Sequence, residues 1–180
     1  MKKTIAILVA IILCMTLCAP SFADDSWTIF VYLCGSDLES EYGLASVNMQ
    51  EMIEGSAAAN VRFVVETGGA ASWSNEAAAY ELDRFEIAGG VSTVVERQPF
   101  GNMGDSGTLA DFLRWGLTKY SSAHTGLVLW NHGGGSINGV CFDELSGSDS
   151  LSLRKIDFAL SSVRDLLPGK FDFIGFDACL

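Results

Sequence analysis

The 180-residue sequence predicts an α/β fold with a mostly parallel sheet and one small antiparallel hairpin. Two observations lead to this expectation. Strand-like and helix-like stretches alternate along the chain, as they do in βαβ units. Several strand-like stretches are apolar at consecutive positions, which is typical of strands covered on both faces. No internal repeat, low-complexity segment or linker divides the chain, so residues 24–180 are expected to form one domain.

Residues 1–23 are expected to be a secretory signal peptide that precedes the fold. Lys2 and Lys3 come before an apolar run over residues 4–17, and small residues at the end of the segment offer a cleavage site. The apolar run is too short for a stable membrane anchor. The sequence therefore predicts a secreted, periplasmic or cell-envelope protein that has no stable anchor after cleavage.

The mature chain is expected to begin with a buried strand and an amphipathic helix. Residues 27–33 are rich in β-forming side chains and are apolar throughout, as in a strand covered on both faces. Apolar side chains recur at helical spacing over residues 42–53, and Gly55 follows as a stop. These two segments supply the first strand and the first helix of the alternating pattern.

A second strand and a hairpin are expected next. Residues 60–66 are strand-like, and two further strands over residues 80–87 and 91–95 flank the Gly89-Gly90 pair. Two glycines between strand-like runs are a hairpin signal. Charged residues alternate along this hairpin, so it is expected to be partly exposed.

A helix is expected after Gly101, with Asp105 or Ser106 as its N-terminal cap. Apolar side chains lie along one face of this helix: Leu109, Phe112, Leu113, Leu117 and Tyr120. The cap and the face together predict that it packs on the sheet.

The last part of the chain predicts one βαβ unit. A strand over residues 127–131 leads into His132, and a final strand over residues 172–177 leads to Cys179. Between them we expect a loop over residues 136–150, with a short strand at 140–142, and then a helix over 151–167 that Pro168-Gly169 ends.

This βαβ unit places a histidine and a cysteine at the same edge of the sheet. Strands joined by such a crossover are parallel and usually neighbours, so their carboxyl ends meet at one edge, where open α/β folds bind ligands. Neighbouring strands lie about 5 Å apart. His132 and Cys179 are therefore expected to meet over one substrate bond.

The chemistry of these two residue types indicates nucleophilic catalysis. A thiolate is a strong nucleophile, and a nearby imidazole can exchange a proton with the thiol and the leaving group. The backbone N–H groups of Gly133 and Cys179 are candidates to stabilise an oxyanion. The sequence indicates no third residue that orients the imidazole, so a His132–Cys179 dyad is predicted.

Composition excludes several other functions. The net charge is −11, which disfavours nucleic-acid binding but would attract cationic peptides. No cysteine or histidine spacing suggests zinc. Beyond residue 23 three cysteines remain, an odd number that leaves at least one thiol free. Cys34 and Cys141 are expected to be inert and buried, and His124 to be a surface or capping residue.

The two strand ends, Asn131-His132-Gly133 and Asp177-Ala178-Cys179, resemble the clostripain family of cysteine peptidases. More distantly they are similar to gingipains, legumains and caspases. Residues 27–39, 139–144 and 151–160 also resemble that family, so the similarity covers nearly all of the mature chain. It implies a caspase–hemoglobinase-like α/β/α sandwich, with His132 as general base and acid and Cys179 as nucleophile.

The resemblance also implies the substrates: proteins or peptides that are cleaved after Arg or Lys. Asp177 sits at the position that matches the acid of the S1 pocket. Calcium serves some relatives, but the sequence places no site for it, and the acidic loop at 143–149 is interpreted as solvated. Family domains continue beyond the nucleophile, so the peptidase domain at 24–180 is expected to be incomplete. Residues 136–150 contain no Lys or Arg at which the chain could cleave itself.

Alternative interpretations stay open. In one alternative, the chain is an inactive fragment; in another, it is a surface binding module derived from this fold. The stretch from His132 to Gly135 also matches the oxyanion motif of α/β-hydrolase esterases, although the sequence contains no G-x-S-x-G nucleophile motif. Asp177 could be only a turn residue. Asp37 could serve as the S1 acid, or could cap the turn at Gly35-Ser36.

Overall fold

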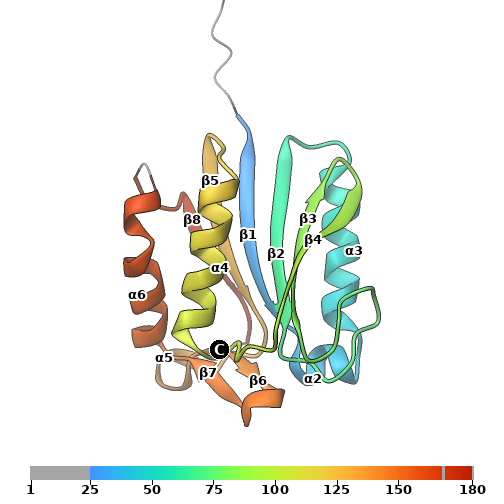
Figure 1. Cartoon of the computed structure of the whole chain (residues 1–180), viewed down its shortest axis with the longest axis vertical. Coiled ribbons are helices and arrows are strands. Elements are labelled where there is room, and N and C mark those ends of the chain that lie inside the picture. Colours follow the sequence, from blue (N-terminus) through green and yellow to red (C-terminus); the bar gives the residue numbers. More distant parts are fainter. Residues whose placement is uncertain (1–24, 168, 180) are drawn as a thin grey trace, which may run out of the picture.

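The computed structural model describes residues 25–167 and 169–179. Six of the described strands form one sheet: β1 (Trp27–Cys34), β2 (Val61–Gly68), β3 (Leu82–Ala88), β4 (Val91–Gln98), β5 (His124–Trp130) and β8 (Phe173–Asp177). Their order in the sheet is β4-β3-β2-β1-β5-β8 (Figure 1). Strands β2, β1, β5 and β8 are parallel, and β3 and β4 add an antiparallel hairpin to β2. The predicted fold class is confirmed.

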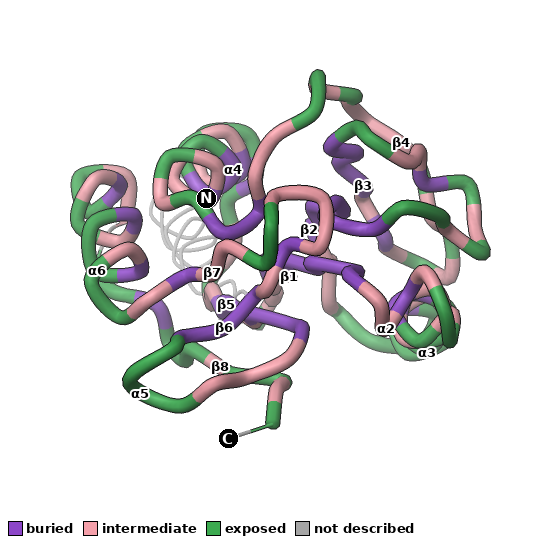
Figure 2. The backbone as a smooth tube through the Cα atoms, turned by 90° about the horizontal axis from the view of Figure 1, so that it is seen from below, coloured by how far each residue is buried: buried purple, intermediate pink, exposed green. Residues whose placement is uncertain are grey.

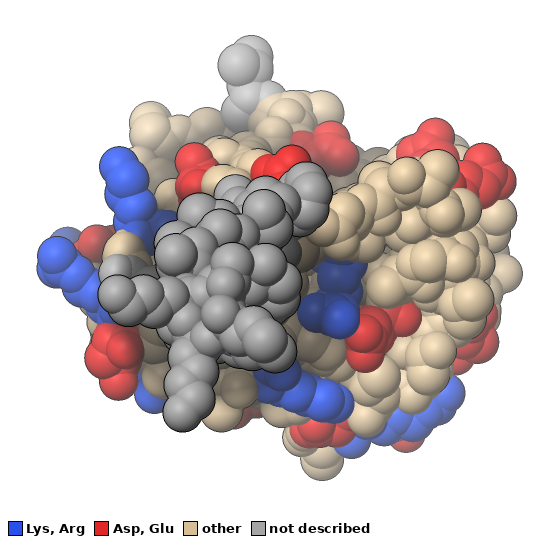
Figure 3. All heavy atoms as spheres, turned by 90° about the horizontal axis from the view of Figure 1, so that it is seen from above, with Lys and Arg blue, Asp and Glu red and all other residues tan. Residues whose placement is uncertain are grey.

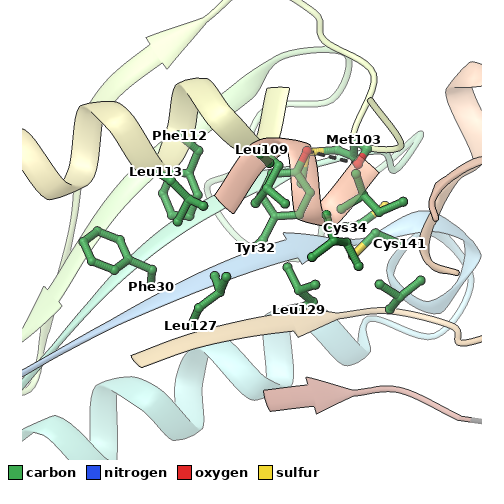
Figure 4. Packing of buried hydrophobic residues seen from close by; sticks show 14 of the residues in the cluster. Phe30, Tyr32, Cys34, Met103, Leu109, Phe112, Leu113, Leu127, Leu129 and Cys141 are labelled. Carbon is green, nitrogen blue, oxygen red and sulfur yellow. Dashed lines mark hydrogen bonds between the residues drawn. The ribbon is translucent and has the colours of Figure 1, made fainter. Parts of the chain in front are cut away.

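Helices α4 (Ser106–Lys119) and α6 (Leu153–Ser162) cover one face of the sheet, where they lie side by side (Figure 1). Alternate residues of β1 and β5 point to this face and meet the apolar stripe of α4 (Figure 4). The cluster includes Phe30, Tyr32, Leu109, Phe112, Leu113, Leu127 and Leu129. Each fully buried side chain of this kind contributes about 1.5–3 kcal/mol. This face is the larger part of the core.

The opposite face carries α2 (Ser36–Ser40) and α3 (Leu44–Ser56). Val31 and Leu33 of β1 pack there against Ala45 and Met49 of α3. Strand β8 is an edge strand of the described sheet, and most of its residues are exposed. The layers therefore form the expected α/β/α sandwich, with its best-buried part around β1.

The hairpin turn forms as predicted, but its first strand is not exposed. Gly89 and Gly90 have φ values of 59° and 80°, a left-handed pair that a two-residue hairpin turn requires. The hairpin is partly exposed, as expected, because β4 carries its exposed positions, but the charged residues Asp83 and Arg84 of β3 are buried. Arg84 can be buried because its charge is paired: its Nε donates to Glu66 Oε2 of β2 at 2.7 Å.

The segment between β5 and β8 is more structured than expected. It forms α5 (Gly135–Asn138), β6 (Val140–Asp143), a 3-10 turn (Glu144–Ser146) and β7 (Asp149–Leu151). The following helix is shorter than the predicted 151–167. Ser152 caps it by accepting a hydrogen bond from the Lys155 N–H, and after Ser162 the chain tightens into a 3-10 turn at Arg164–Leu166.

The expected signal peptide at residues 1–23 lies outside the described residues. None of the helices in the described part of the chain is long and apolar enough to cross a bilayer.

Candidate active site

Strands β5 and β8 bring the two predicted catalytic residues to one edge of the sheet. The two strands are parallel, with Trp130 paired to Asp177. The Asn131 N–H donates to the Asp177 carbonyl oxygen at 3.3 Å. His132 and Cys179 each follow two residues after these paired strand ends. Figure 2 looks onto this edge, where β8 and the C-terminal end of the chain lie beside β5 and α5. The predicted βαβ neighbours are thus confirmed.

Gly133 makes the closest approach between the two strand ends. A Cβ atom at this position would overlap the Cys179 carbonyl oxygen and lie 3.2 Å from the Ala178 Cβ. Only glycine therefore lets the backbone after His132 lie against the backbone at Cys179. This contact joins the two strand ends at the level of the main chain.

The His132 ring is held by a carboxylate from a third strand end. Its Nε2 lies 2.9 Å from Asp37 Oδ1, in the first turn of α2 directly after β1. The Ser36 hydroxyl donates to the same oxygen at 2.6 Å. This hydroxyl first, and the imidazole second, lower the pKa of Asp37 below its usual value.

Sequence reasoning did not assign Asp37 to the histidine. The signal was available, because β1 is a buried strand and Asp37 follows its carboxyl end. The rule that placed His132 and Cys179 at one edge also applies to this strand. What the sequence does not show is that β1 is the other neighbour of β5.

Two neighbouring cavities contain the predicted site residues. The Asp177 cavity, of about 440 Å³, is lined by Leu38, Leu44, Val47, Asn48, Trp130, Asn131, Asp177, Ala178 and Cys179. The His132 cavity, of about 500 Å³, is lined by Ser36, Asp37, His132, Gly133, Phe142, Glu144 and Ser148. Cys179 also lines a third, apolar cavity of about 360 Å³ together with Gly133. Asp177 and Cys179 thus share a cavity, whereas His132 lines a different one. Gly133 lines both the His132 cavity and the third cavity, to which Cys179 belongs. None of the hydrogen bonds between described residues joins the two predicted catalytic side chains directly.

The other two described cysteines lie buried beneath this edge, next to Trp130 and Asn131, and the other histidine lies at the far end of β5. Cys34 and Cys141 are buried, and burial raises the pKa of both thiols. Cys179 is the exposed thiol among the described residues. His124 lies at the opposite end of β5, stacked on Trp27 with ring centroids 4.7 Å apart. These positions agree with the roles that the sequence suggested.

The acidic loop does not fit a calcium site. Asp143 is buried, and its carboxylate accepts from the N–H groups of Met103, Leu145 and Ser146. Asp149 is paired with Lys155 at 2.7 Å. The interpretation of this loop as solvated is wrong for Asp143. Within the described residues no group of three or more acidic, cysteine or histidine side chains could hold a metal ion.

Comparison with solved structures finds this fold in C11 cysteine proteases. A secreted C11 protease from Bacteroides thetaiotaomicron, solved with an irreversible peptide inhibitor, is 25% identical over 86% of this chain and 42% of its own, with a TM-score of 0.63. The B. thetaiotaomicron protease iotapain, also described as secreted, is 17% identical over 86% of this chain and 46% of its own, with a TM-score of 0.63. An inactive zymogen from Parabacteroides distasonis is 22% identical over 87% and 43%, with a TM-score of 0.56.

The chain spans less than half the length of these structures. No curated protein sequence matches it. The profile of the clostripain family, peptidase family C11, matches residues 31–180, which includes both strand ends of the site. With the matching fold and the histidine and cysteine at one sheet edge, this match shows that the chain belongs to the clostripain family of cysteine peptidases.

Proposed function

We propose that this chain carries the His132–Cys179 dyad of a secreted cysteine endopeptidase that cleaves after Arg or Lys. The observation that supports it most is the pairing of β5 with β8, which brings the two strand ends to one edge with Gly133 against Cys179. Membership of a family of cysteine peptidases supports the same chemistry. Secretion is proposed from the signal-like segment at residues 1–23.

The reaction proceeds through a thioester. His132 takes the thiol proton, and the Cys179 sulfur attacks the scissile carbonyl carbon. When the tetrahedral intermediate collapses, the C–N bond breaks and His132 gives the proton to the leaving amine. Water then attacks the thioester, with His132 as general base, and releases the acid product and the free thiol.

The oxyanion is assigned to the N–H groups of Gly133 and Cys179. The two backbones lie against each other, because a Cβ atom at Gly133 would overlap the Cys179 carbonyl oxygen. One such donor contributes about 3–4 kcal/mol to transition-state stabilisation in enzymes where it has been measured.

Substrate specificity is assigned to the Asp177 cavity. Its walls include apolar side chains of Leu38, Leu44 and Val47, and Asp177 is exposed to it close to Cys179. The aliphatic stem of a P1 arginine or lysine can lie on the apolar wall while its charged end meets the carboxylate. Arginine can form two parallel hydrogen bonds there.

Fluorogenic peptides with Arg, Lys, Asp or Ala at P1 test this proposal on the full-length protein. We expect cleavage of the Arg and Lys peptides, which Cys179→Ala and His132→Ala abolish. Asp177→Asn should reduce kcat/KM for the Arg peptide and leave that for the Ala peptide little changed. Undiminished activity of Cys179→Ala would refute the mechanism, and equal rates with Asp and Arg peptides would refute the assignment of Asp177.

The alternatives predict different outcomes in the same assay. A binding module derived from this fold would show no cleavage, and iodoacetamide would label Cys179 no faster than a free thiol. An esterase would hydrolyse short-chain esters and not peptides, but nothing in the structure favours it, because Gly134 and Gly135 begin the short helix α5.

A further inference from the structure

Asp37 is held firmly in place beside His132. The Gly35 and Ser36 N–H groups donate to the carbonyl oxygens of Gly68 and Gly69, at 2.8 and 3.1 Å, so the start of α2 is fixed to the end of β2. Ser36 is buried and has a left-handed φ of 51°, a conformation that costs a non-glycine residue of order 1–3 kcal/mol. The structure around Ser36 therefore has to enforce the turn that presents Asp37.

The rest of α2 is fixed by a second buried carboxylate. Glu39 is only 2% exposed, and its oxygens accept from the N–H and the hydroxyl of Ser46 and from the Ser74 N–H, at 2.7–2.8 Å. These bonds connect α2 to α3 and to the loop after β2. Asp37 is thus presented by a short helix that is anchored on two sides.

The contact itself selects one form of the histidine. An ionised carboxylate only accepts hydrogen bonds, so the Nε2 that lies 2.9 Å from Asp37 Oδ1 carries the hydrogen. Nδ1 is then the nitrogen that can take the thiol proton.

We infer that Asp37 is a positioning residue, which fixes the orientation and the tautomer of His132 so that Nδ1 serves Cys179. This inference rests on the proposed peptidase function. It extends the predicted dyad to a three-residue relay of Asp37, His132 and Cys179. Each of these residues follows the carboxyl end of one of three adjacent strands, β1, β5 and β8. Asp37 acts through His132.

A second carboxylate faces the same cavity but is otherwise engaged. Glu144 lines the His132 cavity, and its Oε1 accepts from the Ala71 N–H at 2.8 Å and from the Ser40 hydroxyl. Asp37 is the carboxylate that hydrogen-bonds His132 among the described residues. Glu144→Gln is therefore a matched control, since it removes a nearby negative charge without removing the bond to the ring.

Histidine NMR gives a readout that does not depend on activity. The chain contains two histidines, so the ring signals of His132 and His124 can be assigned with His132→Ala. The ring ¹⁵N chemical shifts of His132 distinguish the tautomer with the hydrogen on Nε2 from the one with it on Nδ1. Wild type should show the Nε2–H tautomer, and Asp37→Ala should show a larger share of the Nδ1–H tautomer, because the carboxylate that accepts the Nε2 hydrogen is gone. The His124 signals should stay the same in Asp37→Ala, and Glu144→Gln should leave the His132 tautomer as in wild type. The same His132 tautomer in wild type and Asp37→Ala would overturn the inference.

Peptide cleavage and alkylation test whether the effect reaches the thiol. Asp37→Ala should lower kcat by roughly 10- to 100-fold with little change in KM. Asp37→Asn, which can still accept the Nε2 hydrogen, should recover part of that loss. Equal kcat in wild type and Asp37→Ala would overturn the positioning role.

Failure of the proposed function gives a different pattern. In that case the wild type does not cleave the peptides, and the rate of Cys179 alkylation alone tests whether Asp37 acts through His132. Mass spectrometry of the iodoacetamide-labelled Cys179 peptide should show slower labelling in His132→Ala and in Asp37→Ala than in wild type. If Asp37→Ala labels at the wild-type rate while His132→Ala labels slowly, the relay does not include Asp37. Circular dichroism and thermal unfolding of each variant establish that the fold is retained.

Discussion

Arg84 is the largest fully buried side chain of the described chain, and three carboxylates share its guanidinium group. Glu66 lies 2.7 Å from it, Glu96 3.2 Å and Asp111 2.5 Å, and the Trp115 ring lies 4.7 Å from its central carbon. Glu66 is fully buried, and its Oε1 has no hydrogen-bond partner among the described residues. Burial outweighs the attraction of Arg84 and raises the pKa of Glu66 to about 7.

This raised pKa predicts an unusual pH dependence of stability. Folded Glu66 keeps its proton to higher pH than the unfolded chain, whose ordinary pKa is 4.5. The folded protein therefore binds more protons between pH 4.5 and 7, and its unfolding free energy falls as pH rises through this window. Relative to Glu66→Gln, the wild type should lose about 2–3 kcal/mol between pH 5 and pH 8. Urea unfolding of both proteins at the two pH values measures this difference.

A surface variant serves as the control for Glu66. Glu41 is exposed, so Glu41→Gln should follow the wild type at both pH values. A constant difference between wild type and Glu66→Gln across the window would show that Glu66 is ionised in the folded protein throughout.

At the scale of single residues, local pattern placed His132, Gly133 and Cys179 just after apolar strands and Asp177 at the end of one, and the structure places them there. Local pattern was not enough for Arg84. Its charge suggested an exposed strand, and its partners come from β2, β4 and α4, which no local pattern connects. A buried charge becomes predictable only when the strand order is known.

At the scale of the elements, the buried carboxylate of Asp143 holds the loops at the site edge in place. Asp143 ends β6, and its two oxygens accept from the Met103, Leu145 and Ser146 N–H groups at 2.8–3.1 Å. It thereby joins the segment before α4 to the turn after β6. Glu144 extends the same network to α2 through Ser40.

Asp143→Ala should therefore loosen both segments. It leaves three N–H groups without an acceptor, each worth about 1–3 kcal/mol when buried, so we expect a loss of about 3 kcal/mol or more. Native-state hydrogen exchange should show faster exchange at the Met103, Leu145 and Ser146 amides. Asp143→Asn keeps one oxygen acceptor and should lie in between, and Asp157→Ala on the exposed face of α6 should change stability by less than about 0.5 kcal/mol. Unaltered exchange at these three amides would contradict this role.

The helices and strands also divide into those that local pattern predicts and those that depend on contacts between distant segments. The strands, the hairpin turn and α4 with its Asp105 cap were predictable, because periodicity and turn residues act locally. Helix α2 was not, because its start depends on bonds from Gly35 and Ser36 to the end of β2. The predicted helix at 151–167 began too early because Leu151 pairs with Val140 as a strand residue.

At the scale of the whole molecule, charged side chains lie at both ends of the parallel strands. Figure 3 views the end at which the parallel strands begin, where basic and acidic side chains are intermixed. The opposite end carries the candidate site, with the acids Asp37, Glu41, Asp105, Glu144 and Asp177 and the basic residues Arg97, Arg154 and Lys155. The chain as a whole has a net charge of −11. If the proposed function holds, we expect this net negative charge to attract a cationic peptide before the peptide meets Asp177.

The net negative charge predicts a salt dependence that the proposed contact of P1 arginine with Asp177 does not explain by itself. Two peptides with the same arginine at P1, one with lysines and one with glutamates at remote positions, should differ in kcat/KM at low salt, because the long-range potential acts on the net charge of the peptide. The difference should shrink from 50 mM to 1 M NaCl, as the screening length falls to about 3 Å. Glu41→Lys should reduce the advantage of the lysine peptide and leave kcat unchanged. If both peptides respond equally to salt, attraction acts only through the P1 side chain, and the net negative charge has no steering role.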